Sequence, residues 1–406
     1  MTPGSQTGAV ALRRWSPAAI ALMLSASLWG QSARVFRDGD SWVEETTGTL
    51  PAGHEFRAST DLGSLQVAGT ASQVSQVSYV VRKRSRSSTE QEARQQFELL
   101  RISTSRAGDA VVLEGHLLGH NVKRVTADIV VQLPPQTQVV KVETREGALA
   151  VASIAGSVAG STAGGNVRVD RISGPVKIVS GGGNMEATNV TTDLYLQSGG
   201  GNVSVEGANG QVMIKTGGGR VHVGTSGAAS IETGAGNIEV DRCSGDVRVN
   251  SGGGNLNLGD VSGTVTAETG GGTVKIASAQ GEVRVITGGG AVELMKIARS
   301  AHVETGGGPI TVQFVARPGQ FGDSSLHTAL GNIVVYLPRD LGVSVHAATE
   351  MASGPGIKSE FQGLAITSEG GQYGPKAMFG EGQLNGGGPI LRLRTTIGQI
   401  EIRRSQ

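Results

Sequence analysis

The stretch Ser180-Gly-Gly-Gly-Asn-Met-Glu-Ala187 is followed, 18 residues further on, by Ser198-Gly-Gly-Gly-Asn-Val-Ser-Val205. This signature is a Ser or Thr ahead of a run of mostly glycine, and it returns in steps of 18 residues with a single step of 17. It begins at Thr162, Ser180, Ser198, Thr216, Thr233, Ser251, Thr269, Thr287 and Thr305, and a weaker copy begins at Thr144. A fixed period of this length is typical of stacked, near-identical units, so a solenoid is favoured over a globular fold.

Each unit carries two short apolar patterns. Counted from the signature Ser or Thr, positions five and seven are apolar around a mostly polar position six, as in Val203-Ser-Val205. Positions 14 and 16 are apolar in most units, as in Val247-Arg-Val249, and Ile231 takes the inward place in the shortened unit from Thr216. Such alternation predicts two strands per unit, each with one face inward. One coil buries too few aliphatic side chains to offset the ordering of its backbone, so the coils must stack into long parallel sheets.

Three columns of the repeat are expected to be structural. The glycines should form the corners, where they supply positive φ and let successive backbones approach closely. An asparagine column should form hydrogen-bonded ladders, its left-handed tolerance helping the turn. It consists of Asn166, Asn184, Asn202, Asn237 and Asn255. The chain's only cysteine, Cys243, falls in an apolar column and is expected to be a buried spacer rather than a reactive thiol.

The regions beside the repeat differ in character. Residues 1–33 read as an export signal, because Arg13 and Arg14 precede a short apolar run and then small residues, with a buried helix or retained anchor as the alternative. Residues 34–143 are predicted to be rich in strands with one helix, from Thr89 to about Arg101. The regular coils occupy 144–322, and residues 323–406 are predicted to add irregular coils and a cap. The fold class is therefore all-β, a β-solenoid resembling a parallel β-helix.

A Val-Val-x-Leu-Pro segment occurs before and after the regular coils, at Val130 to Pro134 and at Val334 to Pro338. The signature itself returns late, from Asn385 to Leu393, and is followed by Ile397-Gly-Gln-Ile-Glu-Ile402. Together with the Gly-Gly-Gly-Asn-Val-x-Val repeats, these motifs resemble the DUF4097 family, whose members are also named "putative adhesin" domains, over roughly residues 35–406. The resemblance implies a bacterial exported or envelope β-solenoid and carries over no catalytic residues.

Several chemistries find little support in the sequence. A formal charge of +1 gives no reason to expect nucleic acid. The Gly runs lack the Asp of calcium-binding rolls and the Lys of a phosphate loop. His116 and His120 have helical ligand spacing but lie in a glycine-broken segment, so a zinc pair is not favoured. Glu232, Glu268 and Glu304 would lie two coils apart, about 10 Å, which approaches the spacing of a glycosidase pair. Solvated faces are the favoured interpretation of these three, since no aromatic residue flanks them.

No catalytic, cofactor or metal residue is therefore predicted, and the binding residues stay unassigned. The favoured hypothesis is an exported, non-enzymatic, adhesin-like solenoid that binds through its polar outer faces. An envelope scaffold or sensor component acting through protein partners is the alternative. A polysaccharide-active enzyme using Glu268 or Glu304 is a third hypothesis, and the low aromatic content, 3%, counts against sugar binding by ordinary ring stacking.

Overall fold

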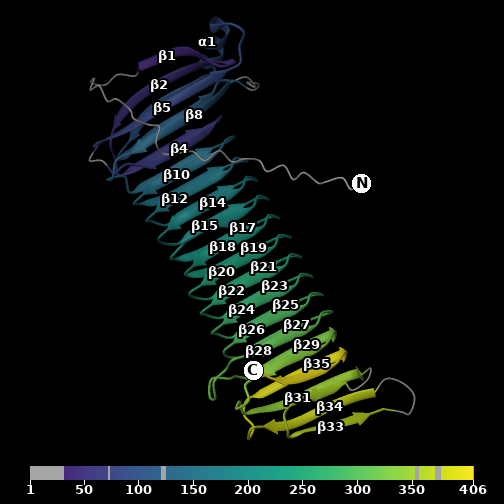
Figure 1. Ribbon diagram of the computed structural model, residues 1–406. Coiled ribbons are helices and arrows are strands. Elements are labelled where there is room, and N and C mark those ends of the chain that lie inside the picture. Colours follow the sequence, from purple (N-terminus) through teal and green to yellow (C-terminus); the bar gives the residue numbers. More distant parts are fainter. Residues whose placement is uncertain (1–31, 72–73, 120–124, 353–355, 371–375, 406) are drawn as a thin grey trace.

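The computed structural model describes residues 32–405 apart from 72–73, 120–124, 353–355 and 371–375. Two long sheets wind together around one core, and the coils stack along a single axis (Figure 1). The export signal predicted for residues 1–33 lies outside the described residues up to residue 31, and Ser32 opens the first strand. The all-β solenoid predicted from the repeat is confirmed.

The first sheet, sheet A, contains the earlier strand of each regular coil. In spatial order its strands are β1 (Ser32–Asp38), β2 (Ser41–Pro51), β5 (Gln76–Ser85), β8 (Val125–Leu133), β4 (Ser64–Gly69), β10 (Leu149–Ile154), β12 (Val167–Ile172), β14 (Met185–Val190), β16 (Val203–Val205), β18 (Val221–Ser226), β20 (Ile238–Cys243), β22 (Leu256–Val261), β24 (Val274–Ala279), β26 (Val292–Ile297), β28 (Ile310–Phe314), β30 (Ile333–Leu337), β36 (Ile400–Arg404) and β32 (Ile357–Ser359). Neighbours pair in parallel except among β1, β2, β5 and β8.

Sheet B contains the later strand of each coil. Its spatial order is β6 (Leu100–Ala107), β7 (Ala110–Leu117), β3 (Glu55–Thr60), β9 (Val139–Thr144), β11 (Ser157–Thr162), β13 (Val176–Ser180), β15 (Leu194–Ser198), β17 (Gln211–Thr216), β19 (Ala228–Thr233), β21 (Val247–Ser251), β23 (Val265–Thr269), β25 (Val283–Thr287), β27 (Ala301–Thr305), β29 (Ser324–Leu330), β35 (Ile390–Ile397), β31 (Val343–Ala352), β34 (Lys376–Leu384) and β33 (Leu364–Glu369). Only the pairs β6–β7, β31–β34 and β33–β34 are antiparallel.

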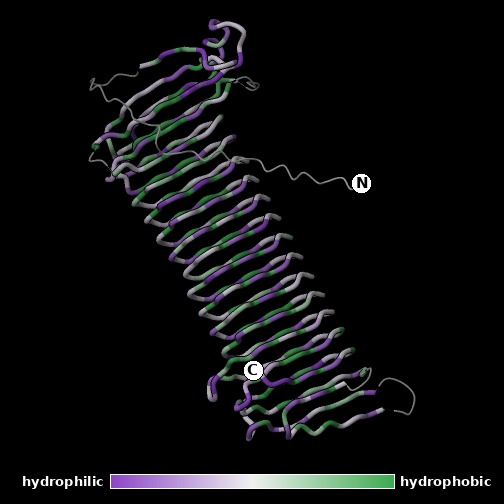
Figure 2. The backbone as a smooth tube through the Cα atoms, viewed as in Figure 1, coloured by the Kyte–Doolittle hydropathy of each residue, from purple (hydrophilic) through white to green (hydrophobic). Residues whose placement is uncertain are grey.

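The inward residues of both sheets form one continuous core from Phe56 to Ile402. Hydropathy alternates along every coil, as the predicted pattern requires (Figure 2). The shortened unit keeps its register because Ile214 pairs with Ile231 and Thr216 with Thr233. Cys243 is fully buried in this core, as predicted.

Glycine acts at the regular corners through close approach, and the expectation of positive φ there was wrong. A Cβ on Gly254, the last glycine of its triplet, would lie 2.1 Å from the carbonyl oxygen of Gly236 one coil below. A Cβ on the middle glycine, Gly253, would meet nothing within 4 Å. Positive φ values occur instead at irregular corners such as Gly147 and Gly388.

Two hydrogen-bonded columns bind each coil to the next. The asparagine ladder is confirmed: the side-chain oxygen of Asn184, for example, accepts from the backbone amide of Asn202 at 2.9 Å. None of the column's asparagines has positive φ, so the left-handed backbone expected there is absent. The side-chain hydrogen bond to the next coil is what the structure shows for these asparagines. The signature hydroxyls form a second, buried column. Thr269 Oγ1 donates to the Gly254 carbonyl at 2.8 Å and accepts from its own Gly272 amide at 3.4 Å.

Replacing Thr269 with Val is expected to leave that buried carbonyl without its hydroxyl partner. The loss of such a partner costs about 1–3 kcal/mol. Urea unfolding should therefore show a lower midpoint with an unchanged slope, because the coil itself stays formed. Thr266→Val, an outward position on the same strand, should unfold like the parent chain.

Both ends of the stack contain a coil that is out of sequence order. The coil formed by β3 and β4 lies between the coil of β7 and β8 and the coil of β9 and β10, and it pairs with both. The chain that leaves β8 at Pro134 therefore skips this position in the stack before it starts β9. Where it leaves β30 at Pro338, it passes over a rung that β35 and β36 later fill. The two Val-Val-x-Leu-Pro segments thus precede the two skipped rungs. Residues 323–406 contain further coils, and the last coil in sequence is internal in space.

The N-terminal end is covered by helix α1 (Glu90–Glu98), near the position predicted. Thr89 caps it and accepts from the Glu92 amide, and Ala93 and Phe97 pack inward against Ala127. The basic run Arg82-Lys-Arg84 lies in β5, between β2 and β8. Its side chains pair with acidic neighbours: Arg82 with Glu45, Lys83 with Glu44, and Arg84 with Asp128.

Candidate binding groove

The outer face of sheet B is hollowed where one rung carries only small side chains. On β11 the outward residues are Ser157, Ala159 and Ser161. The strands on either side place Lys141 and Lys177 in register with Ala159. Because the outward side chains of β11 are short and the lysines on both neighbouring strands are long, the surface is lower along β11 than on either side.

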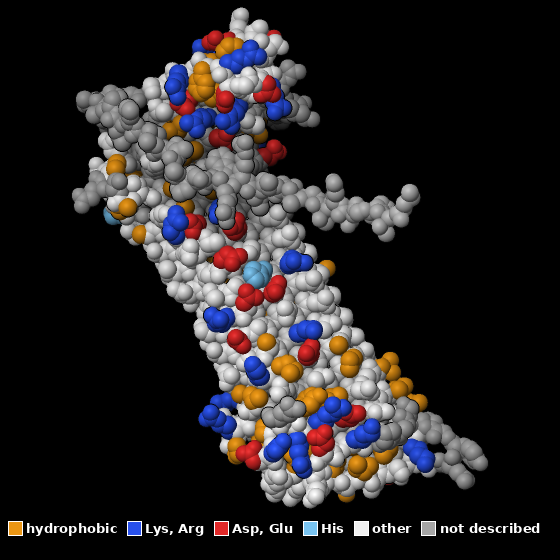
Figure 3. All heavy atoms as spheres, viewed as in Figure 1, with side chains coloured by type: hydrophobic (Ala, Val, Ile, Leu, Met, Phe, Trp, Pro, Cys, Tyr) orange, Lys and Arg blue, Asp and Glu red, His pale blue; other side chains and the backbone are white. Residues whose placement is uncertain are grey.

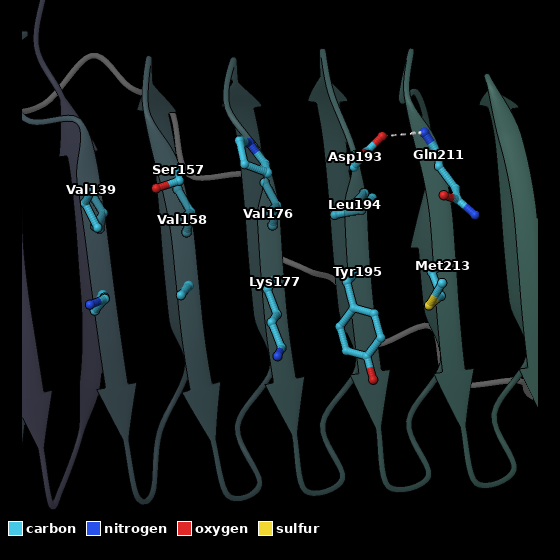
Figure 4. A pocket seen from close by; sticks show the side chains of 14 residues that line it. Val139, Ser157, Val158, Val176, Lys177, Asp193, Leu194, Tyr195, Gln211 and Met213 are labelled. Carbon is cyan, nitrogen blue, oxygen red and sulfur yellow. Dashed lines mark hydrogen bonds between the residues drawn. The ribbon is translucent and has the colours of Figure 1, made fainter.

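Two adjoining hollows make up this groove. One, of about 390 Å³, extends toward β17 and is lined by Val139, Val140, Lys141, Ser157, Val158, Ala159, Pro175, Val176, Lys177, Asp193, Leu194, Tyr195, Gln211 and Met213 (Figure 4). The other, of about 760 Å³, extends toward β3 and includes Arg57, Glu114 and Gly160. They share Lys141, Ala159 and Lys177, so they form one open trough across several coils.

Tyr195 gives the groove its one aromatic surface. It is the only Phe, Trp or Tyr in the sequence between Tyr79 and Phe314 apart from Phe97 in α1, so the coils from β9 to β27 have no other. Its ring is half-buried beside Met213, and its hydroxyl donates to the Gln197 side chain at 2.7 Å. The ring is therefore held on the surface by contacts along and across the strands.

Among the described residues, Lys177 has no carboxylate within ion-pair distance, and its ammonium group lies 5.7 Å from the centroid of the Tyr195 ring. The two side chains lie next to each other on neighbouring strands (Figure 4). An ammonium near a ring face is attracted by the ring quadrupole and keeps its charge in solvent. Lys177 and Tyr195 thus offer a cation beside an aromatic plane.

The other two cations of the groove share one carboxylate partner. Glu55 contacts Arg57 and Lys141, each at 2.8 Å. Hydrogen bonds from Arg57, and then Lys141, lower the pKa of Glu55 to about 2. Glu55 therefore stays ionised at neutral and mildly acidic pH, and among the groove's described cations Lys177 is the one without a carboxylate partner.

The residues that the sequence raised as candidates do not come together. Register places Ile286 between Glu268 and Glu304, and Asn250 between Glu232 and Glu268, and none of these lines the groove. His116 lies on a strand, β7, where it approaches Asp61 and Glu114, and His120 lies outside the described residues. The sequence did not reveal the groove, although three small outward residues in one unit and the isolated Tyr195 were visible signals.

The described part of the chain contains no helix with the length and hydropathy needed to cross a membrane. No curated protein matches the chain.

The solved structures that match it include three of low identity. A "putative cell adhesion protein" from Clostridium sporogenes is 9% identical, covering 89% of this chain and 100% of that one, with a TM-score of 0.18. A "putative adhesin" from Bacteroides fragilis is 14% identical, covering 72% and 96%, with a TM-score of 0.20. Another from Parabacteroides merdae is 10% identical, covering 73% and 96%, with a TM-score of 0.26. Scores of this size do not establish a common overall shape.

The model of the family described as Toastrack DUF4097 matches residues 60–250. This span runs from the end of β3 to β21, and it includes the groove strands β9, β11, β13, β15 and β17. The resemblance indicated by the glycine signatures is confirmed there. Over residues 60–250, a little under half of its length, the chain is thus similar to the DUF4097 (Toastrack) family.

Proposed function

We propose that this protein is an exported, non-enzymatic binding module that holds an acidic polysaccharide in the groove on sheet B. The observation that carries the proposal is the position of Tyr195 and Lys177. The only Phe, Trp or Tyr ring of the coils from β9 to β27 and a cation without a carboxylate partner lie side by side in the groove along β11, whose outward residues are small.

The shape of the site suits a polymer better than a small molecule. The groove is open and crosses several coils, whereas sites for small ligands enclose most of the ligand surface. A sugar ring can lie over the half-buried Tyr195, and an acidic substituent can then reach the Lys177 ammonium. The small side chains of β11 leave room for the chain to continue across the rung.

The backbone beneath the site is stiff, which favours binding of an extended chain. Every strand under the groove pairs with a strand on each side, and Asp193 accepts from the Gln211 amide at 2.9 Å to tie two rungs at the groove wall. A preformed surface loses little conformational entropy on binding. Several weak contacts along one rigid face can therefore add up.

Export is predicted from the sequence of residues 1–33. The adhesin-like role is proposed because the groove offers a surface for binding a polymer. A surface module of this kind would meet polysaccharide in the envelope or outside the cell. The same groove could not hold a glycosidase pair of the kind considered from the sequence, because Glu268 and Glu304 lie on other coils.

Titration calorimetry against acidic and neutral polysaccharides of matched length tests the proposal. We expect the acidic chains to bind, with affinity falling as salt screens the Lys177 charge. Lys177→Gln should weaken binding roughly tenfold or more, because a charge-assisted hydrogen bond contributes about 1.5–3 kcal/mol. Tyr195→Ala should weaken it about threefold to tenfold, in line with ring contacts of about 0.5–1.5 kcal/mol.

Arg284→Gln is the matched control. Arg284 occupies the same outward column as Lys177 and Tyr195 but lies on β25, outside the groove. It should bind like the parent chain. Equal losses in Arg284→Gln and Lys177→Gln would mean only diffuse charge attraction, and absence of binding to any polysaccharide would favour the scaffold alternative.

A further inference from the structure

On the opposite sheet, one imidazole lies between two carboxylates. His222 projects outward from β18, in register with Glu239 on β20, and Asp241 follows two residues along that strand on the same face. His222 Nδ1 is 3.8 Å from a Glu239 carboxylate oxygen, and Nε2 is 3.8 Å from one of Asp241. One donor atom from each residue can be chosen so that all three lie within 4.8 Å of one another.

These separations exceed hydrogen-bond length, so the three side chains surround a space rather than closing on each other. Zinc bonds to imidazole nitrogen and carboxylate oxygen are about 2.0–2.2 Å long. Tetrahedral ligands at such distances lie roughly 3.4 Å apart, by geometry from the same bond lengths. Small rotations of exposed side chains would bring the three donors to that spacing.

No side chain on β18 fills the outward position beside His222, and the rung below carries a further carboxylate, Glu206. Gly224 stands two residues after His222 on β18, so no side chain occupies the position between Glu206 and Asp241. The Ser204 hydroxyl, in register with His222, donates to the Glu206 carboxylate at 3.2 Å. Figure 3 shows a His side chain among several acidic side chains midway along the stack.

We propose that His222, Glu239 and Asp241 bind a divalent transition-metal ion of the Zn²⁺ class. The imidazole selects against Ca²⁺ and Mg²⁺, which prefer all-oxygen ligand sets. The carboxylates lie on one coil and the imidazole on the next, so the ion ties two rungs together. Three protein ligands on an exposed face leave a coordination position open to solvent.

Calorimetry of the full chain with Zn²⁺, after removal of any purification tag, tests the site. We expect one ion per chain and a higher melting temperature with bound ion, because the unfolded chain lacks the site. Loss of an outer-shell partner of a metal ligand typically lowers metal affinity roughly 10–100-fold. His222→Gln and Asp241→Asn each remove a direct ligand, so each should lower the Zn²⁺ affinity by at least that factor. Co²⁺ should give a visible absorption band that both variants lose.

His302→Gln is the control. His302 is also an outward histidine, 34% exposed against 30% for His222, and it too approaches a carboxylate, Glu282 at 3.4 Å. It lacks a second carboxylate on the other ring nitrogen, which contacts Ser325 instead. This variant should bind Zn²⁺ like the parent chain. If His222→Gln binds equally well, or if the parent chain shows no saturable binding at millimolar Zn²⁺, the site does not exist.

Discussion

Removal of residues 389–406 is expected to open the C-terminal end of the stack rather than merely shorten it. β35 and β36 are the last strands in sequence, yet they fill an internal rung between β29–β30 and β31–β32. Leu391, Leu393, Ile400 and Ile402 are buried there. At about 1.5–3 kcal/mol each, their loss removes roughly 6–12 kcal/mol, which is comparable to the stability of a whole domain.

Hydrogen exchange measures the result directly. In the truncated chain, amides of β31–β34 should exchange rapidly while those of β12–β25 stay protected, because each coil contacts only its neighbours. The exposed sheet edges should also promote association. Leu393→Ser should give a milder form of the same pattern, and the adjacent outward Arg392→Ser should give none. Full protection of β31 after truncation would show that the rung is dispensable.

The second large effect is expected from a single methyl group. Gly254→Ala places a Cβ 2.1 Å from the Gly236 carbonyl oxygen, so two coils must separate locally. Overpacking typically costs 1–3 kcal/mol, and a clash with backbone should reach about 3 kcal/mol or more. Guanidinium unfolding followed by circular dichroism should show a clearly lower midpoint.

The neighbouring Gly253→Ala serves as the control, since its Cβ would meet nothing within 4 Å and the chain already carries Ala235 at the equivalent place. It should be neutral or more stable by about 0.4–1 kcal/mol, because alanine restricts the unfolded chain. If the two variants unfold alike, the corner glycines serve chain flexibility and the close-approach account is wrong.

The regular coils were predictable because the same alternation of inward apolar and outward polar residues recurs in every unit. Inward positions such as Val203 and Val205 alternate strictly, and the asparagine ladder follows from one column of identical residues. Corner geometry was less accessible. The sequence displays Gly252, Gly253 and Gly254 alike, whereas the structure shows that the first and last face a carbonyl oxygen one coil below and the middle one faces open space.

Long-range order and surface sites were not predictable from one sequence. Nothing local in the Pro338 segment says that the chain skips a rung that a segment some 50 residues later will fill. The groove and the metal cluster each depend on outward residues from neighbouring coils, as with Lys177 beside Tyr195 and His222 beside Glu239. Writing the units in register shows such neighbours, but the side-chain separations that distinguish a site from a solvated face require the structure.

The central claim is that the β11 groove binds polysaccharide, and cysteine labelling tests it most directly. Because the native Cys243 is fully buried, Ala159→Cys adds a single accessible thiol at the groove floor, and Thr266→Cys adds one in the same outward column outside it. A maleimide should label both variants, and saturating acidic polysaccharide should slow labelling at position 159 alone. Equal rates at position 159 with and without polysaccharide would contradict the proposed function.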